Sequence, residues 1–391
     1  MMQILFLSRW FPFPPTNGSK LRIYHLLRGL AQRNKVSLIS YYSDKEGISV
    51  NGALRGICDP IHVIPYKGFD PGNSKIPLDL LRITPRSVLD TYSVQVESLI
   101  RKELQQKKYD LVIASQFDMA VYAKAVAGMP AIFEEVETGF YYDRANNGYS
   151  KLKRFRHKLT WLKHRTYLGK LLDSYRACTV VSEKESLILQ RDVSRAIDIK
   201  IIPNCIDLNS YTDYHRDPQP NSLIFTGSLK FAPNYEAMCW FIQEVFPIVQ
   251  SHIPAARLTI TGDSGGKQLP RASNVHLSGF VPDIRRMVAS ASVSLAPILN
   301  GGGTRLKILE AMALRSPVVA TSKGAEGLDG IHGEHLLIAD DPHSYAAAVI
   351  DLLKDTHLNR RISDNAFQLV KSNYDWAVVM PRFLELVESV V

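Results

Sequence analysis

Short apolar runs alternate with helical patterns along the first half of the chain. Continuous apolar runs of strand length are separated by longer stretches in which apolar residues recur every three or four positions, as in Leu21–Leu30. The runs predicted to form strands are Gln3–Ser8, Lys35–Tyr42, Tyr109–Ser115, Pro130–Glu137 and Ala177–Glu183. Because this alternation is typical of a parallel sheet covered by helices on both faces, we expect a doubly wound α/β domain.

The second half repeats this pattern after an interruption. Residues Ile201–Ser222 are rich in Pro, Asn and Asp, a composition typical of a linker, and we place a hinge near residues 204–221. A helix is predicted from Pro233 to about Val249. The predicted strands are Ser222–Ser228, Ala256–Gly262, Asn274–Gly279, Ser292–Pro297, Pro317–Thr321 and Glu334–Asp340. Open parallel sheets bind ligands at the carboxyl ends of their strands, so two such domains facing across a cleft suit a reaction between two substrates.

Length and composition agree with two soluble domains. The chain has 391 residues, of which 46% are apolar, and no apolar run is long enough to span a membrane. Ile4–Leu7 is too short for the core of a signal peptide, so a cytoplasmic protein is expected. The four cysteines are far apart and lack metal-ligand spacing, which disfavours a disulfide framework.

The positive charge is concentrated in the first half. The net charge is +9, but residues 1–205 carry 31 basic and 19 acidic side chains, whereas the remainder carries 16 basic and 19 acidic ones. Ser150–Leu172 is especially basic, with Leu152, Phe155, Leu159 and Leu162 at helical spacing. An amphipathic basic helix of this kind suits an anionic membrane surface. The alternative is a core helix with a solvated cationic face, and nucleic acid is disfavoured because no known binding motif accompanies the charge.

The segment Gly301–Thr321 carries candidate chemistry. Glycines before a helix allow a ligand to approach the backbone, and the unpaired amides of the helix start suit phosphate. Arg305 and Lys307 add full charges, so these groups together are suited to a diphosphate. Glu310 follows Lys307 by one turn and is placed to accept hydrogen bonds from a sugar diol. The alternative is a surface ion pair between Lys307 and Glu310 beside an ordinary glycine loop.

A second candidate is the acidic stretch Phe133–Thr138. If the strand persists, Glu135 and Glu137 point to the same face, because side chains alternate along a strand. At the carboxyl end of the strand both would face the cleft and orient the acceptor or the donor sugar. A solvated acidic loop is the alternative, and a magnesium site is another.

Several segments resemble the retaining, family 4 glycosyltransferases of the GT-B fold. The Gly301–Thr321 segment, followed by "GAEGL" (Gly324–Leu328), resembles the family's donor-site signature. The other segments that resemble the family, in its order, are "FPPTNGSKLRIYHLLRGLAQR", "VVSEKE", "IIPNCIDL", "FTGSLKFAPNYEAMCWF", "LSGFVPDIRRMVASASVSLAP" and "YDWAVVMPRFLELVESVV". The resemblance implies an acceptor-binding domain over residues 1–205, a nucleotide-sugar-binding domain over residues 206–374, and a final helix over residues 375–391 that crosses back to the first domain.

The resemblance also implies roles for individual residues. Arg305 and Lys307 would be catalytic. From their position at the end of the predicted strand, Glu137 is expected to be catalytic as well and Glu135 to contact the acceptor. The residues implied in donor binding are Gly18, Gly227, Lys230, Phe280, Val281, Gly303, Thr304, Leu306 and Glu310. The departing β-phosphate would be stabilised by cations and helix amides, without a metal or other cofactor. Gly302 stands where many members carry a glutamate that contacts the transferred sugar, which leaves the identity of that sugar open.

The expected activity is therefore transfer of a sugar from a UDP- or GDP-sugar to a glycan or lipid-linked acceptor, in the synthesis of cell-surface polysaccharide or glycolipid. The expected location is the cytoplasm, including the inner face of the plasma membrane. A catalytically silent sugar-nucleotide-binding partner is the alternative that Gly302 raises. A nucleotide-dependent oxidoreductase is disfavoured, because no G-x-G-x-x-G turn follows the first strand.

Overall fold

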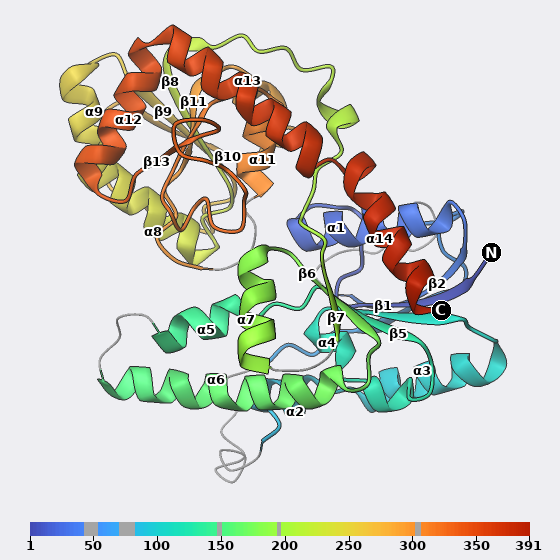
Figure 1. Cartoon of the computed structure of the whole chain (residues 1–391). Coiled ribbons are helices and arrows are strands. Elements are labelled where there is room, and N and C mark those ends of the chain that lie inside the picture. The colour runs from blue at the N-terminus through green and yellow to red at the C-terminus, as the bar shows by residue number, and fades with distance from the viewer. Residues whose placement is uncertain (43–53, 70–82, 147–150, 194–196, 302–305) are drawn as a thin grey trace. The chain divides into compact units, whose positions relative to one another are not determined.

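A computed structural model describes residues 1–42, 54–69, 83–146, 151–193, 197–301 and 306–391 (Figure 1). These residues form two compact units. The first unit comprises Met1–Pro203 together with Met380–Val391, and the second comprises Asn204–Val379. The division lies close to the border that the sequence analysis placed after residue 205, and the last turns of the chain group with the first unit.

Within the described residues, the first unit contains a seven-stranded parallel sheet in the order β3-β2-β1-β4-β5-β6-β7. The strands are β1 Gln3–Ser8, β2 Lys35–Tyr42, β3 Ile61–Pro65, β4 Leu111–Ser115, β5 Ala131–Glu134, β6 Ala177–Val180 and β7 Asp198–Ile201. The central strands β1 and β4 are buried along nearly their whole length, because helices cover both faces of the sheet. Their carboxyl ends meet at one edge, where a doubly wound sheet binds its ligand.

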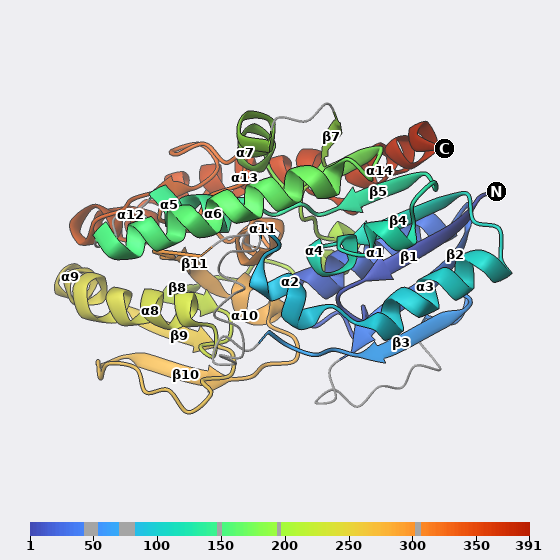
Figure 2. The same cartoon turned by 90° about the horizontal axis from the view of Figure 1, so that it is seen from below.

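The helices of the first unit lie in two layers (Figure 1). The elements are α1 Gly18–Ala31, α2 Arg86–Thr91, α3 Val94–Gln106, α4 Phe117–Ala120, α5 Gly139–Asn146, α6 Lys151–Leu172 and α7 Glu183–Val193, with α14 Trp376–Val390 from the end of the chain. α1 and α14 cover one face of the sheet, and α3 and α6 cover the other. Gly29 of α1 lets α14 approach closely, since a Cβ there would lie 2.2 Å from the sulfur of Met380. Figure 2 shows the length of α6, with α5 beside it.

The second unit has its own parallel sheet, with six strands among the residues that the structure describes, in the order β10-β9-β8-β11-β12-β13. The strands are β8 Gln219–Thr226, β9 Arg257–Thr261, β10 Val275–Gly279, β11 Ala291–Ala296, β12 Val318–Ala320 and β13 Leu337–Ile338. The helices are α8 Ala232–Trp240, α9 Phe246–His252, α10 Arg285–Ala289, α11 Leu306–Ala313, α12 Pro342–Lys354 and α13 Thr356–Asn373. A π-helical turn at Phe241–Val245 joins α8 to α9, so the single helix predicted from Pro233 to Val249 has this irregularity inside it.

Every strand predicted from an apolar run is present, although some are shorter than expected. The two strands that the sequence pattern missed, β3 and β7, are the edges of the first sheet. Both are short, β3 is mostly half-buried and β7 mostly exposed, so neither carries the continuous apolar run by which the central strands are found. Among the described helices, none combines the length and the apolar character that a membrane span requires.

Candidate functional site

Three loops of the second unit turn through glycine where β8, β9 and β10 end. Gly227, Gly262 and Gly279 all have positive φ, at 138°, 108° and 71°. The loops are tightly stacked: the N–H of Gly262 donates to the carbonyl of Gly279 at 2.7 Å. A Cβ on Gly262 would lie 2.6 Å from the carbonyl carbon of Gly227, a separation that carbon atoms do not tolerate. The close stacking of these loops therefore requires glycine, and the glycines themselves add no side chain at this edge of the sheet.

Lys307 reaches this glycine edge from the first turn of α11. Its Nζ donates to Oδ1 of Asn234 at 3.0 Å and lies 3.9 Å from the centroid of the Phe225 ring. A Cβ on Gly227 would be only 2.9 Å from the same Nζ. The structure thus places the ammonium group of Lys307 directly against the bend at Gly227. The family resemblance had assigned both residues to the same ligand.

Lys230 has a different partner. Its ammonium group forms an ion pair with Asp263 in the loop after β9, and this contact lowers the pKa of Asp263. Its aliphatic stem lies against Gly265, where a Cβ would be 2.5 Å from its Cγ. Both charged groups are largely exposed, so the pair is weak and a phosphate can compete for the lysine.

Glu310 is half-buried one turn beyond Lys307 in α11. Its Oε1 accepts a hydrogen bond from the hydroxyl of Tyr211 at 3.4 Å. Burial raises the pKa of Glu310, and the hydrogen bond from Tyr211 and the charges of Lys307 and Arg285 oppose that rise. Tyr211 lies in the 3₁₀ turn Leu208–Tyr211, which the sequence analysis treated as linker. It is a candidate site residue that linker composition concealed.

Some of the other residues predicted to bind the donor lie within the part of the chain that the structure describes, and some lie outside it. Phe280 and Val281 follow β10 directly, with Phe280 74% exposed. Leu306 begins α11, and Gly18 begins α1 in the first unit, where Asn17 caps the helix. Gly303, Thr304 and Arg305, together with Gly302, lie outside the described residues.

In the first unit, the prediction that the strand continues through Glu137 is wrong. β5 ends at Glu134, and Glu135 has a φ of 59°. The chain turns because Thr179 of β6 takes over the next two amides: its Oγ1 accepts from the N–H of Glu135 at 2.9 Å, and its carbonyl accepts from the N–H of Val136 at 2.8 Å. The alternation of side chains along a strand therefore does not explain where Glu135 and Glu137 point.

Glu134, which the sequence analysis did not single out, forms a fully buried ion pair. Its Oε1 lies 2.6 Å from Nε of Arg22, and its Oε2 accepts from the Ser115 hydroxyl at 2.6 Å. Arg22 also donates to the carbonyls of Ile202 and Pro203 at 2.8 and 3.0 Å. The pair ties α1, β4, β5 and the end of the unit together. The charged residues themselves were visible in the sequence, but their partners are distant along the chain.

Glu135 and Glu137 nevertheless line one cavity of about 390 Å³ at the carboxyl ends of the strands. Nε2 of Gln116 donates to Oε2 of Glu135 at 2.7 Å. Burial raises the pKa of Glu135 to about 8, although Arg22 acts in the opposite direction. Burial also raises the pKa of Glu137 and of Asp118, which lines the same cavity. With a pKa of about 8, the carboxyl group of Glu135 is able to donate as well as accept hydrogen bonds near neutral pH.

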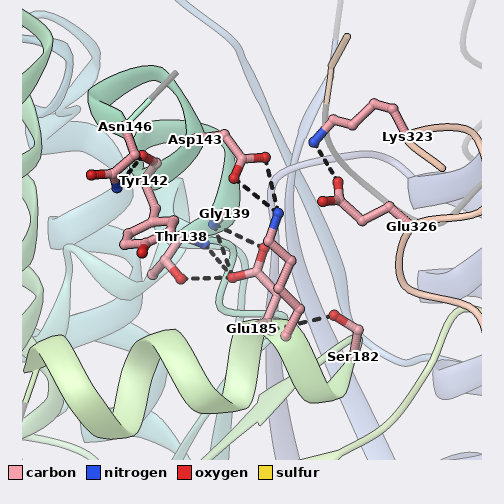
Figure 3. A network of polar contacts seen from close by, with 10 residues as sticks. Thr138, Gly139, Tyr142, Asp143, Asn146, Ser182, Glu185, Lys323 and Glu326 are labelled. Carbon is pink, nitrogen blue, oxygen red and sulfur yellow. Dashed lines mark hydrogen bonds and ion pairs between the residues drawn. The ribbon is translucent and has the colours of Figure 1, made fainter. Parts of the chain in front are cut away.

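The loop that carries Glu137 is held by Glu185 of α7. The Glu185 carboxylate accepts from the N–H and the hydroxyl of Thr138, at 2.7 and 2.6 Å, and from the N–H of Gly139 at 2.9 Å (Figure 3). It therefore caps α5 from another helix, satisfying amides that a helix start leaves unpaired. Next to it, Lys184 pairs with Asp143 at 2.9 Å. The solvated acidic loop considered above does not describe this well-anchored segment.

The magnesium alternative finds no support in the geometry. Among the residues that the structure describes, no group of three or more His, Cys, Asp or Glu side chains is arranged to hold a metal ion. The Glu135 carboxylate is contacted by Gln116, an amide donor, and lies 3.9 Å from Arg22, a cation.

The basic segment forms the predicted helix, α6. Its predicted apolar positions are not in a core: Leu152 and Phe155 are 81% and 68% exposed, and Leu159 and Leu162 are also exposed. The buried side of the helix is formed further along by Trp161, His164 and Leu168. The alternative of a core helix with a solvated face is therefore wrong for residues 152–160.

The fold and the family comparison agree on the class of protein. Residues 220–355 match the family model described as glycosyl transferases group 1. The fold is similar to that of a sucrose-phosphate synthase from Thermosynechococcus elongatus, with a TM-score of 0.72 and 15% identity over 100% of this chain and 99% of that one. It is also similar to Anabaena HepE in complex with UDP-glucose, with a TM-score of 0.69 and 17% identity over the full length of both chains. Residues 220–355 therefore form a glycosyl transferases group 1 domain, and the chain has the GT-B fold, as the motifs indicated.

Sequence relatives extend this result. An uncharacterized 44.6 kDa protein in the cps region of Klebsiella pneumoniae is 24% identical over 392 residues, covering 96% of this chain and 97% of that protein. A phosphatidyl-myo-inositol mannosyltransferase of Mycolicibacterium smegmatis is 28% identical over 205 residues. That match covers 48% of this chain and 51% of the mannosyltransferase, so it spans about half of either protein.

Proposed function

We propose that this protein is a retaining, metal-independent glycosyltransferase that transfers a sugar from a nucleotide-diphosphate donor to a glycan or lipid-linked acceptor in the synthesis of cell-surface polysaccharide or glycolipid. The observation that carries the proposal is the position of the Lys307 ammonium group against the bend at Gly227. The similarity to structures that hold UDP or UDP-glucose supports a nucleotide-sugar donor. The relative in a cps region supports a role in surface polysaccharide.

The second unit supplies the groups that stabilise the nucleoside diphosphate as it leaves the sugar. As the bond to the sugar breaks, negative charge develops on the β-phosphate. Lys307, the neighbouring Arg305 and the amides that begin α11 stabilise that charge at the glycine edge. Because these cations meet the charge directly, the proposed reaction needs no metal ion.

Glu310 lies one turn from Lys307, which is the distance that separates a ribose from its own diphosphate. Its carboxyl group accepts hydrogen bonds from the two ribose hydroxyls, and Tyr211 keeps it in place. Phe280 and Val281 present backbone groups to the base. By the family resemblance, Gly18 also contributes to binding of the donor phosphates, and Lys230 exchanges Asp263 for a phosphate.

The configuration at the anomeric carbon is retained if the acceptor hydroxyl attacks that carbon from the same face that the phosphate leaves. The departing phosphate then takes the hydroxyl proton, and no protein nucleophile is required. Glu135 orients the acceptor in this scheme, and Glu137 orients the reacting groups beside it.

We further propose that the amino-terminal half of α6 binds the surface of an anionic membrane. Residues 151–172 contain eight Lys or Arg side chains and no Asp or Glu. Leu152 and Phe155 stand exposed among these charges, so apolar insertion and charge attraction act together. A second copy of the same surface is an unsuitable partner, since two such helices repel each other.

The donor site is tested with Lys307→Ala, using full-length protein and a panel of UDP- and GDP-sugars. Turnover, or slow donor hydrolysis, is expected to fall about a hundredfold, on the scale of other oxyanion-stabilising groups. Lys354→Ala, at an exposed lysine at the end of α12, is the matched control and keeps its activity. Equal activity of the two variants would show that the diphosphate binds elsewhere. Binding of donor without any transfer by the wild-type protein would favour a silent partner.

The membrane proposal is tested by sedimentation with vesicles. Binding to vesicles that contain phosphatidylglycerol is expected, and it should weaken as salt increases. Replacing Lys151, Lys153, Arg154 and Arg156 by alanine removes about 1 kcal/mol per charge, which is more than a hundredfold in affinity. Phe155→Ser tests the apolar part separately. Binding that is indifferent to salt and to these changes would refute the proposal.

A further inference from the structure

The cavity of the first unit is lined entirely by residues of that unit. It lies where β1, β4 and β5 end, and its volume of about 390 Å³ is near the lower limit of small-molecule sites, about 300–1,000 Å³. A single monosaccharide ring fits such a volume, whereas a nucleotide sugar does not. The proposed donor groups of the second unit therefore do not account for it.

One part of the cavity lining consists of aromatic rings and of the cation Arg9, whose charge is balanced by a carboxylate. The guanidinium carbon of Arg9 lies 4.3 Å from the centroid of the Trp10 ring and 3.2 Å from that of Tyr66. Nε of Arg9 is 3.6 Å from the carboxylate of Asp118, which also accepts from the Tyr66 hydroxyl. Because Asp118 balances the charge of Arg9, this cation does not attract anions into the cavity.

Another part of the lining carries hydrogen-bonding groups. Glu135, Glu137 and Gln116 contribute two carboxyl groups and an amide. If ionised, the carboxyl groups repel an anionic ligand, and if protonated, they offer both donors and acceptors. In either state they suit hydroxyl groups, and the ionised state opposes phosphate or carboxylate.

His164 adds an unsatisfied polar atom to the same lining. Its side chain is 4% exposed, and its ring stacks on Tyr141 with centroids 4.3 Å apart. Among the described residues that line the cavity, it is the one whose buried ring nitrogen, Nε2, lacks a hydrogen-bond partner. Burial lowers the pKa of His164 to about 4, so the ring is neutral. An unpaired buried nitrogen destabilises the protein unless a ligand satisfies it.

We propose that this cavity binds an uncharged pyranose ring of the acceptor, and that Trp10, Asp118 and His164 belong to this sugar subsite. The inference rests on the proposed function, since transfer requires an acceptor hydroxyl near the donor. It goes further by naming the chemistry of the acceptor unit: a neutral sugar, and neither a sugar phosphate nor a uronic acid. Aromatic faces cover the apolar side of the ring, and the carboxyl, amide and imidazole groups bind its hydroxyls.

The test is calorimetric titration of the full-length protein with methyl hexosides, without donor. At least one neutral hexoside is expected to saturate the protein. Its uronic acid and 6-phosphate counterparts should bind at least tenfold more weakly. Failure of every neutral hexoside to bind, or tighter binding of the charged counterparts, would overturn the inference.

Variants locate the binding. Trp10→Ala and His164→Phe are each expected to weaken the hexoside at least tenfold, whereas His276→Phe, at an exposed histidine of β10 in the second unit, should not. Unchanged binding in both cavity variants overturns the assignment. UDP binding, measured on the same samples, shows that each variant is folded and reports the proposed donor site. Failure of the wild-type protein to bind either UDP or GDP would count against the proposed function alone, because the hexoside titration does not depend on it.

Discussion

Replacing Gly262 by alanine tests the stacked glycine loops from which the donor site is built. A Cβ at this position would lie 2.6 Å from both the carbonyl carbon and the oxygen of Gly227, and 2.8 Å from the N–H nitrogen of Ser228. These are backbone atoms, so no flexible side chain can move aside. The φ of 108° adds strain of about 1–2 kcal/mol for any residue with a Cβ. Overpacking adds about 1–3 kcal/mol, so the expected total loss of stability is about 2–5 kcal/mol.

The same loop provides a matched control. Gly266 also has a positive φ, of 79°, but a Cβ there would meet nothing within 4 Å. Gly266→Ala should therefore cost about 1–2 kcal/mol through backbone strain alone. In urea unfolding, the difference in the free energy of unfolding between the two variants, expected to be about 1–3 kcal/mol, then measures the cost of the close contact alone. Because relief of the contact must displace Gly227, the Gly262 variant should also bind UDP more weakly than the control. Equal stability and equal UDP affinity would refute the stacking of these loops.

Three further predictions concern the first unit. Glu135→Gln should stabilise the protein at pH 8 and leave its stability unchanged near pH 4.5. The pKa of Glu135 in the folded protein is about 8, so the wild-type protein is most stable below the ordinary carboxyl pKa and loses at most about 1.4 kcal/mol per pH unit as pH rises toward 8, whereas glutamine does not titrate. A stability difference between the two proteins in urea unfolding that is constant with pH would contradict this. Arg22→Met should cost about 3–5 kcal/mol because it leaves Glu134 buried without its cation, and adding Glu134→Gln should recover much of the loss; additive losses in chemical unfolding would show that the pair is not coupled. Glu185→Ala should speed amide exchange at Gly139 at least tenfold, since the N–H loses a charged acceptor worth about 1.5–3 kcal/mol, and unchanged exchange would show that the cap is dispensable.

The architecture was predictable because central strands in doubly wound sheets are buried on both faces. Ile4–Leu7 is apolar throughout for that reason, and in Ala291–Ala296 even the two serines are buried; both segments lie in strands. The edge strands β3 and β7 have one side open to solvent, so their local pattern is weak. The π-helical turn after α8 leaves the apolar spacing almost unchanged, and nothing in the sequence marks it.

The candidate site was predictable in part. The motifs located Gly227, Lys307 and Glu310, because a glycine bend and the first turns of a helix are local features that residue types reveal. The turn at Glu135 was not predictable, since Thr179 imposes it from a neighbouring strand. Tyr211 was concealed for a similar reason: only the fold brings it to Glu310.

By itself, the sequence determined the class of fold, the family of the second half, and the segments that carry its charge and its glycines. These depend on periodicity, composition and short motifs, which are properties of residues near one another in the chain. Only the tertiary structure decided which charges are buried and what balances them, as with Arg22 and Glu134, or how Arg9, Asp118 and His164 come to share one cavity. Those outcomes depend on contacts between distant segments and on the exclusion of water, and both arise only when the sheets and helices pack.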